Sequence, residues 1–316
     1  MAAQAPLREA KRSVEYFELP TRRLLNRCQS DHVPFRWTIN PYRGCEFGCK
    51  YCYARYTHEF MELRDPSLFE ERIFAKLWNE AEFRRDLAKV PRGEMIAIGT
   101  ATDPYQPAER RYGITRRILE VFLGQRGLRL GITTKSDLVA RDADLLAAIS
   151  RQNTVSVHIT ITTLDAGLAR MIEPRAPRPD LRLAALRALV NAGVRTGVSC
   201  SPILPLINDS EAKLDALARA VRQAGAESMS WRILFLREPA RGVFQRFLEE
   251  QFPHLLRRYR ERFEKSSVLR GDYPARITER LRKIRARHGL DPPDPLPEPW
   301  GEPQLELDFS PPAPGQ

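Results

Sequence analysis

The fold of this chain is decided by one stretch, residues 40–55, which reads NPYRGCEFGCKYCYAR. Three of the five cysteines, Cys45, Cys49 and Cys52, fall within eight residues of this stretch. Two glycines stand beside them, and glycine lets a backbone fold back tightly because it tolerates positive φ. The spacing therefore predicts a loop in which three thiolates converge on one small metal centre.

Two kinds of metal centre compete for these cysteines. A closed zinc site needs four ligands, and a fourth would have to come from Cys28, Cys200 or His58, none of which has finger-like spacing. A ferredoxin-type cluster also takes four cysteines, usually spaced C-x2-C-x2-C, and that pattern is absent. A four-iron cluster held by three cysteines leaves one iron free to bind another molecule. We favour this interpretation; a zinc-stabilised protein that binds nucleic acid without catalysis is the alternative.

The C-x3-C-x-aromatic-C motif resembles the signature of the radical S-adenosylmethionine (SAM) enzymes. The wider stretch resembles the spore photoproduct lyase branch, often called DNA repair photolyase-like, and the resemblance extends over most of residues 34–250. It implies a [4Fe-4S] cluster held by Cys45, Cys49 and Cys52, with SAM on the open iron. It also implies cleavage of SAM to a 5′-deoxyadenosyl radical, and a reductant such as flavodoxin or ferredoxin.

Short apolar runs alternate with helical patterns along the chain. The runs predict six strands, at 35–40, 94–100, 128–133, 155–161, 194–203 and 228–236. The periodicity predicts helices at 69–90, 115–123, 142–151, 181–190, 210–224 and 241–251. This alternation favours parallel βαβ units, in either a doubly wound sheet or a partial barrel. The resemblance implies the second, a (β/α)6 partial TIM barrel with the cysteine loop after its first strand.

The barrel is expected to occupy residues 34–252, and three segments lie outside it. Residues 1–33 are polar and punctuated by proline and arginine, so we expect an irregular N-terminal arm. Residues 253–290 are rich in arginine and predict a basic helical extension that covers the barrel. Residues 291–316 are dominated by proline and predict a disordered tail.

Polar residues follow the predicted strands, and in barrels of this kind chemistry gathers at the C-terminal strand ends. The resemblance implies six residues that bind SAM: Tyr51, Thr102, Asp103, Lys135, Thr160 and Ser201. Tyr51 is expected near the adenine, Thr102 and Asp103 at the amino group, and Lys135 at the carboxylate. Thr160 is expected at the ribose or carboxylate, and Ser201 beside the adenine.

Two further residues are candidates for catalysis. Tyr53 resembles a tyrosine that lies near the substrate in photoproduct lyases, and Arg175 either points toward the open barrel mouth or pairs with Glu173. Thr100 stands where those lyases carry a hydrogen-donating cysteine, so we do not expect cleavage of a thymine photoproduct. His158 is expected to point outward into helix packing.

The charge balance favours anionic partners. The chain has 51 Lys and Arg against 40 Asp and Glu, a net charge of +11, which favours nucleic acid. Residues 304–309, QLELDF, resemble the hexapeptide by which bacterial DNA enzymes bind the sliding clamp. No run approaches the ~18 apolar residues of a membrane span, and the first residues have no apolar signal core. We therefore expect a cytoplasmic protein that does not bind a membrane.

Overall fold

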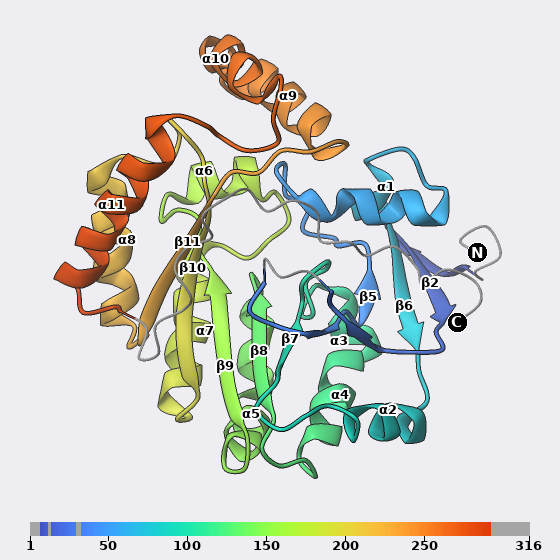
Figure 1. Cartoon of the computed structure of the whole chain (residues 1–316). Coiled ribbons are helices and arrows are strands. Elements are labelled where there is room, and N and C mark those ends of the chain that lie inside the picture. The colour runs from blue at the N-terminus through green and yellow to red at the C-terminus, as the bar shows by residue number, and fades with distance from the viewer. Residues whose placement is uncertain (1–6, 12–13, 30–32, 292–316) are drawn as a thin grey trace.

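The structure is a computed structural model that describes residues 7–11, 14–29 and 33–291 (Figure 1). Its main sheet has seven strands, which are, in spatial order, β11 (Ser228–Ile233), β10 (Arg195–Ile203), β9 (Thr154–Thr160), β8 (Arg129–Thr134), β7 (Met95–Ile98), β4 (Trp37–Ile39) and β3 (Leu25–Arg27). Strands β4, β7, β8, β9, β10 and β11 run parallel, and β3 pairs antiparallel with β4 at one edge. All six predicted strands are confirmed.

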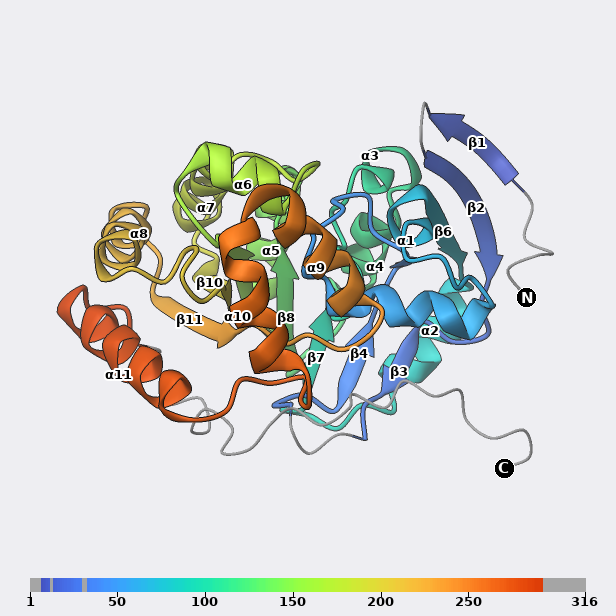
Figure 2. The same cartoon turned by 90° about the horizontal axis from the view of Figure 1, so that it is seen from above.

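Helices follow the strands and cover one face of the curved sheet (Figures 1 and 2). The helices that follow the strands are, in chain order, α3 (Ala108–Tyr112), α4 (Ile114–Phe122), α5 (Ala143–Ser150), α6 (Ala166–Ile172), α7 (Pro179–Asn191), α8 (Glu211–Gln223) and α9 (Ala240–Gln251). Of these, α4, α5, α7 and α8 pack on the sheet, whereas α6 and α9 contribute to a second apolar cluster. The expected (β/α)6 partial barrel is confirmed. Among the residues that the structure describes the barrel does not close, and β11 and β3 form the two edges of the sheet.

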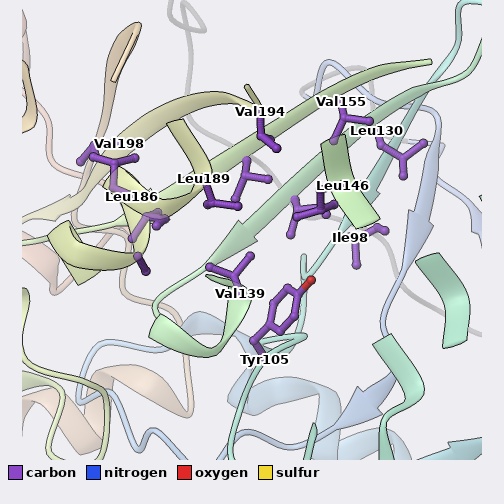
Figure 3. Close-up of a cluster of buried hydrophobic side chains, with 14 of the residues drawn as sticks. Ile98, Tyr105, Leu130, Val139, Leu146, Val155, Leu186, Leu189, Val194 and Val198 are labelled. Atoms are coloured by element: carbon purple, nitrogen blue, oxygen red, sulfur yellow. The ribbon is translucent and has the colours of Figure 1, made fainter. Parts of the chain in front are cut away.

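The face of the sheet that meets the helices is apolar. Figure 3 shows this core, in which Ile98, Leu130, Val155 and Val198 from the strands pack with Leu186 of α7. Each of these side chains is almost fully buried. Burying a side chain of this size stabilises a fold by about 1.5–3 kcal/mol, so this layer holds the strands in register.

The opposite face of the strands, which lines the inside of the barrel, carries small and polar residues. They include Gly131, Thr133, Ser156, His158, Gly197, Ser199, Ser228, Ser230 and Arg232, and most are partly or fully exposed. A closed barrel fills this space with bulky branched side chains. Here it stays open, and the wall that a substrate would meet is polar.

His158 lies on this inner face, so the expectation that it points toward the helices is wrong. A Cβ atom added to Gly197 would lie 2.8 Å from Cδ2 of His158 and 2.6 Å from Oγ of Ser228. Side chains alternate along a strand, and the buried neighbours Val157 and Ile159 occupy the helix side of β9.

A second, four-stranded sheet lies beside the barrel. Its order is β1 (Leu7–Lys11), β2 (Val14–Pro20), β6 (Arg72–Leu77) and β5 (Tyr42–Arg43). The N-terminal arm is therefore not irregular, because it supplies β1, β2 and β3. The predicted helix at 69–90 is also wrong: this segment forms α1 (Leu68–Glu71), β6 and α2 (Glu80–Leu87). Strand β6 lies between two others and has four consecutive buried residues, so it lacks the alternation that marks a half-buried strand.

The C-terminal extension is helical, as predicted, and consists of α10 (Pro253–Phe263) and α11 (Asp272–Arg287). Helix α10 buries Leu255, Tyr259 and Phe263 over the top of the barrel, and α11 packs along α8 (Figure 1). The predicted tail beyond residue 291 and the sliding-clamp segment 304–309 lie outside the described residues. Across the described parts of the chain, every helix is too short or too polar to span a bilayer.

Gly99 follows β7, with φ at +90°, and a Cβ atom there would lie 2.6 Å from Pro104 Cδ and from the Thr133 carbonyl oxygen. We expect Gly99→Ala to destabilise the protein by about 1–3 kcal/mol through backbone strain and this clash, measured by urea unfolding. Gly93→Ala is the matched control, because Gly93 has φ at +82° but nothing within 4 Å of the added atom. An equal loss in both variants would show that the clash contributes nothing.

Candidate functional site

The cluster loop, residues 44–53, connects β5 to the helix η2 (Tyr53–Met61) and is anchored by its own backbone. Gly44 has φ at +78°, and a Cβ atom there would lie 2.7 and 2.8 Å from two backbone carbonyl oxygens. The Cys45 amide donates to the carbonyl oxygen of Phe69 at 2.8 Å, and the Lys50 amide donates to that of Ile172 at 2.9 Å. Glycine at position 44 thus lets the loop lie directly against α1, while α6 holds its other side.

Arg55 holds the second half of this loop. Its guanidinium is 1% exposed and donates to the carbonyl oxygens of Cys49 at 3.1 Å and Pro66 at 2.7 Å. It also forms an ion pair with Glu70 of α1. A buried arginine that bridges backbone and carboxylate in this way fixes where the cysteines point.

The three cysteines of the loop are free thiols; Cys45 and Cys49 are buried and Cys52 is half-buried. Burial raises the pKa of all three, that of Cys49 to about 12. Lys135 acts in the opposite direction on the pKa of Cys49 and Cys52, and Arg55 does so on Cys52. A coordinating metal deprotonates such a thiol outright, and the neighbouring cations suit the negative charge that results.

A buried network surrounds Tyr51, the residue before the third cysteine. Its hydroxyl donates to the Glu173 carboxylate, which also accepts from Thr162 Oγ1 at 3.1 Å and pairs with Arg182 at 2.5 Å. The Nζ of Lys135 lies 5.7 Å from the centre of the Tyr51 ring. Burial alone would raise the pKa of Glu173, but Arg182 and Lys135 outweigh it and hold the pKa below its ordinary value.

Asp103 joins the loop after β7 to the end of β8. Its carboxylate accepts hydrogen bonds from the amide of Tyr105 at 2.9 Å, Thr134 Oγ1 at 2.6 Å and the amide of Lys135 at 2.7 Å. Burial raises the pKa of Asp103, and these donors oppose the shift. The structure thus brings two predicted SAM-binding residues, Asp103 and Lys135, into direct contact.

Two other predicted residues tie the same segment to the cluster loop. Thr102 Oγ1 donates to the Gly44 carbonyl oxygen at 2.6 Å and accepts from Gln106 Nε2 at 3.0 Å. The hydroxyl of Tyr53 donates to the carbonyl oxygen of Thr100. Both side chains therefore set the distance between the cysteines and the second strand end.

Thr160 and Ser201 lie on the inner face of the barrel, at the ends of β9 and β10. Thr160 pairs in register with Ser199, whose Oγ donates to Ser201 Oγ at 2.9 Å. The carbonyl oxygen of Thr160 accepts from Arg182 Nη1 at 3.0 Å. These two residues form a polar wall that continues from the network around Tyr51.

Arg175 lies apart from the other candidates. Its amide donates to the Phe47 carbonyl oxygen at 3.2 Å, and its exposed side chain lines a hollow of about 430 Å³ on the outer side of the cluster loop. Glu173 forms its buried ion pair with Arg182, and not with Arg175 as one alternative had it. The catalytic assignment of Arg175 remains a prediction.

Sequence reasoning missed Arg182 and Gln106, and it considered Glu173 only as a partner of Arg175. All three are buried and connect segments that are far apart in the sequence: Glu173 lies 122 residues from Tyr51, and Gln106 lies 62 from Gly44. Such contacts leave no local pattern. Their charges gave no signal either, because Glu173 and Arg182 stand in the sequence among Arg175, Arg178 and Asp180.

The chemistry of the donor set fits an iron–sulfur cluster. Within the described ranges, no three His, Cys, Asp or Glu side chains are grouped to hold one metal ion. In a four-iron cluster each thiolate binds a different iron, so the sulfurs do not meet at one point. Cys45, Cys49 and Cys52 would hold three irons, and the side chains of Lys135 and Tyr51 border the space beside them.

A family model described as the Radical SAM superfamily matches residues 39–219. The chain belongs to the radical SAM superfamily. The matched region contains the cluster loop and four of the six parallel strands, β7 to β10, and it begins at the last residue of β4. Members of this superfamily use a [4Fe-4S] cluster and SAM, which are the two cofactors of this chain.

Individual proteins agree with this radical SAM assignment. An uncharacterized protein of Mycobacterium tuberculosis is 37% identical over 259 residues, which are 82% of this chain and 76% of that protein. An uncharacterized protein of Methanocaldococcus jannaschii is 28% identical over 222 residues, 69% of this chain and 77% of that protein. A structure of spore photoproduct lyase matches with a TM-score of 0.65 at 16% identity, covering 86% of this chain and 79% of that one. The predicted resemblance to the lyase is confirmed at the level of the fold.

We expect Cys45→Ala, Cys49→Ala and Cys52→Ala each to abolish cluster binding, because each removes the protein ligand of one iron. Iron and sulfide content after anaerobic reconstitution measures this. Cys28→Ala and Cys200→Ala are the controls and should keep the full iron content. Loss of iron in Cys28→Ala would contradict the three-cysteine site.

Glu173→Gln should destabilise the cluster-free protein by about 3–5 kcal/mol at pH 7, because it leaves the buried Arg182 unpaired. The folded-state pKa of Glu173 is lowered, so its contribution is complete above the ordinary glutamate pKa and is lost as pH falls through the folded value. Urea unfolding should therefore show that the free energies of unfolding of the wild-type protein and of Glu173→Gln converge below about pH 4. Glu261→Gln, in an exposed pair with Arg257, is the control and should change little. A stability difference between wild type and Glu173→Gln that does not change with pH would contradict an ionised Glu173 in this pair.

Proposed function

We propose that this chain is a radical SAM enzyme that cleaves SAM to a 5′-deoxyadenosyl radical, which then acts on a further substrate. The observation that carries the proposal is the cluster loop, in which Cys45, Cys49 and Cys52 lie beside Lys135 and Tyr51. When bound, the cluster supplies the electron that breaks the bond between carbon and sulfur in SAM. The residues of the chain itself have to bind SAM and orient it beside the cluster.

Lys135 is the residue that we assign to the SAM carboxylate. Burial alone would lower the pKa of Lys135, but Cys49 and Glu173 outweigh it and the pKa is raised, so the ammonium persists at neutral pH. Asp103 holds the Lys135 backbone and thereby positions this ammonium. A carboxylate offers about four acceptor positions, and three are used, so Asp103 keeps one for the amino group of SAM.

The remaining contacts follow the rim of the barrel. We assign Tyr51, fixed by Glu173, to the adenine side of SAM, and Thr160 and Ser201 to its ribose and adenine. Thr102 is engaged with Gly44, so we assign it to shaping the loop near the amino group. These side chains leave the inner face of the barrel for the substrate.

A nucleic acid is the substrate class that we favour. The net charge of +11 supports it, and so does the polar inner wall. Tyr53 is the catalytic candidate closest to this space. Thr100 has no thiol, so a hydrogen atom for a product radical has to come from another group. We further propose a cytoplasmic setting, which keeps thiols reduced, and a sliding-clamp partner for residues 304–309.

The test is anaerobic reconstitution of the full chain with iron and sulfide, followed by SAM and dithionite. A brown protein that forms 5′-deoxyadenosine supports the proposal, and Cys49→Ala is the control that should form none. Colourless protein with stoichiometric zinc would overturn it in favour of a zinc-stabilised binding protein. Deuterium transfer from candidate oligonucleotides into 5′-deoxyadenosine would then identify the substrate.

We expect Lys135→Met to keep the cluster and to weaken SAM binding roughly ten- to hundredfold, because a charge-assisted hydrogen bond contributes ~1.5–3 kcal/mol. Calorimetric titration of the reconstituted protein with SAM measures this. Lys89→Met removes an exposed ammonium far from the site and should leave the affinity unchanged. A normal titration in Lys135→Met would move the carboxylate contact to another residue.

A further inference from the structure

The hollow beside Arg175 is lined by four exposed arginines that the proposed function does not use as a group. We call it the arginine hollow: Arg110, Arg170, Arg175 and Arg178, with Phe47 and Leu181 between them. Its volume is about 430 Å³. It lies where α3, the loop from α6 to α7 and the cluster loop meet.

The arginine hollow faces away from the inside of the barrel. Glu173 points toward Tyr51 and the cysteines, whereas Arg175, two residues later, points into the hollow. In Figure 2, α3 and α6 lie on the side of the barrel opposite the gap between β3 and β11. The cluster loop therefore has an inner side toward SAM and an outer side toward the hollow.

Phe47 connects the hollow to the cluster. It stands between Cys45 and Cys49, two residues from each, so its Cα lies within about 8 Å of theirs. Its side chain is buried in the same apolar cluster as both cysteines and also lines the hollow. A molecule seated in the hollow is thus separated from the cysteines by little more than this loop.

The residues that line the hollow include four arginines and one acidic residue, Asp137. Arg178 pairs with Asp180 at 2.7 Å, and Arg110 is 4.0 Å from Asp137. Arg170 donates to the Pro174 carbonyl oxygen at 2.5 Å, a partner without charge. The hollow therefore attracts an anionic surface.

The apolar part of the hollow indicates which kind of anion fits. Tyr105, Pro107 and Pro177 line it, and Leu181 is 43% exposed there. Apolar residues combined with exposed arginines are typical of protein–protein interfaces. Phosphate contacts of nucleic acids rely on cations and hydrogen-bond donors instead. The composition of the hollow favours an acidic protein over a nucleic acid.

We propose that the arginine hollow is the docking site of an acidic one-electron carrier protein, which reduces the cluster from the outer side of its loop. The inference rests on the proposed function. SAM and substrate approach the inner side, so the carrier and the reactants do not compete for space. In the reduction, the carrier loses one electron, the cluster gains it, and no atom is transferred.

The first test measures binding of oxidised flavodoxin, as the acidic carrier, to the reconstituted full chain by calorimetry at low and high salt. The double variant Arg110→Glu/Arg178→Glu should bind at least about tenfold more weakly at low salt, and the difference should shrink at high salt. Both residues are exposed and outside the SAM site. The control Arg219→Glu/Arg257→Glu reverses two exposed arginines on α8 and α10 and should bind normally.

The second test compares electron sources. Formation of 5′-deoxyadenosine with reduced flavodoxin should slow in the Arg110→Glu/Arg178→Glu protein, whereas formation with dithionite should not change, because a small reductant needs no docking site. If wild-type protein forms none with dithionite, the proposed function itself fails. If it does, and the double variant binds flavodoxin as the control does, the docking site is refuted. Loss of binding to a single-stranded oligonucleotide with normal flavodoxin binding would reassign the hollow to nucleic acid.

Discussion

The buried ion pair between Glu173 and Arg182 is the interaction on which the site depends. Arg182 also donates to the carbonyl oxygens of Pro177 and Thr160, and Glu173 accepts from Tyr51. One pair thus joins the cluster loop, the end of β9 and the start of α7. A buried pair often contributes little net stability, because desolvating both charges offsets their attraction. We infer that its value here is geometric: it fixes where Tyr51 and the third cysteine stand.

The same pair sets the charge balance beside the cysteines. Without Arg182, Glu173 would place an uncompensated negative charge next to thiols that must become thiolates. With it, the ammonium of Lys135 remains available to a ligand, and Asp103 holds the Lys135 backbone from the other side. The acidic side chains near the cysteines are therefore each held by cations or hydrogen-bond donors, which suits a site for a zwitterion such as the methionine end of SAM.

The features that could be predicted from the sequence are those with a local pattern of residues. The cysteine spacing and the six apolar runs are local, and each predicted strand is found. Strand β6 was missed because it is buried on both sides, so its apolar residues run together and mimic a helix. His158 was placed on the wrong face although it lies two residues from Thr160, and side chains two residues apart share one face of a strand. The pair of Glu173 and Arg182 could not be predicted, since their approach depends on how α6 and α7 pack against the loop.

The open barrel also explains why the C-terminal helices are needed. An inner face of glycine, serine and threonine lacks the apolar packing that stabilises a closed barrel. A second apolar cluster replaces part of it: Phe47 and Ile172 pack with Phe244 of α9 and with Leu255 and Tyr259 of α10. The Tyr259 hydroxyl donates to the Pro205 carbonyl oxygen at 2.6 Å and fastens α10 to the loop after β10. The same cluster buries Cys45 and Cys49, so the helices that stabilise the open barrel also shield the metal site from water.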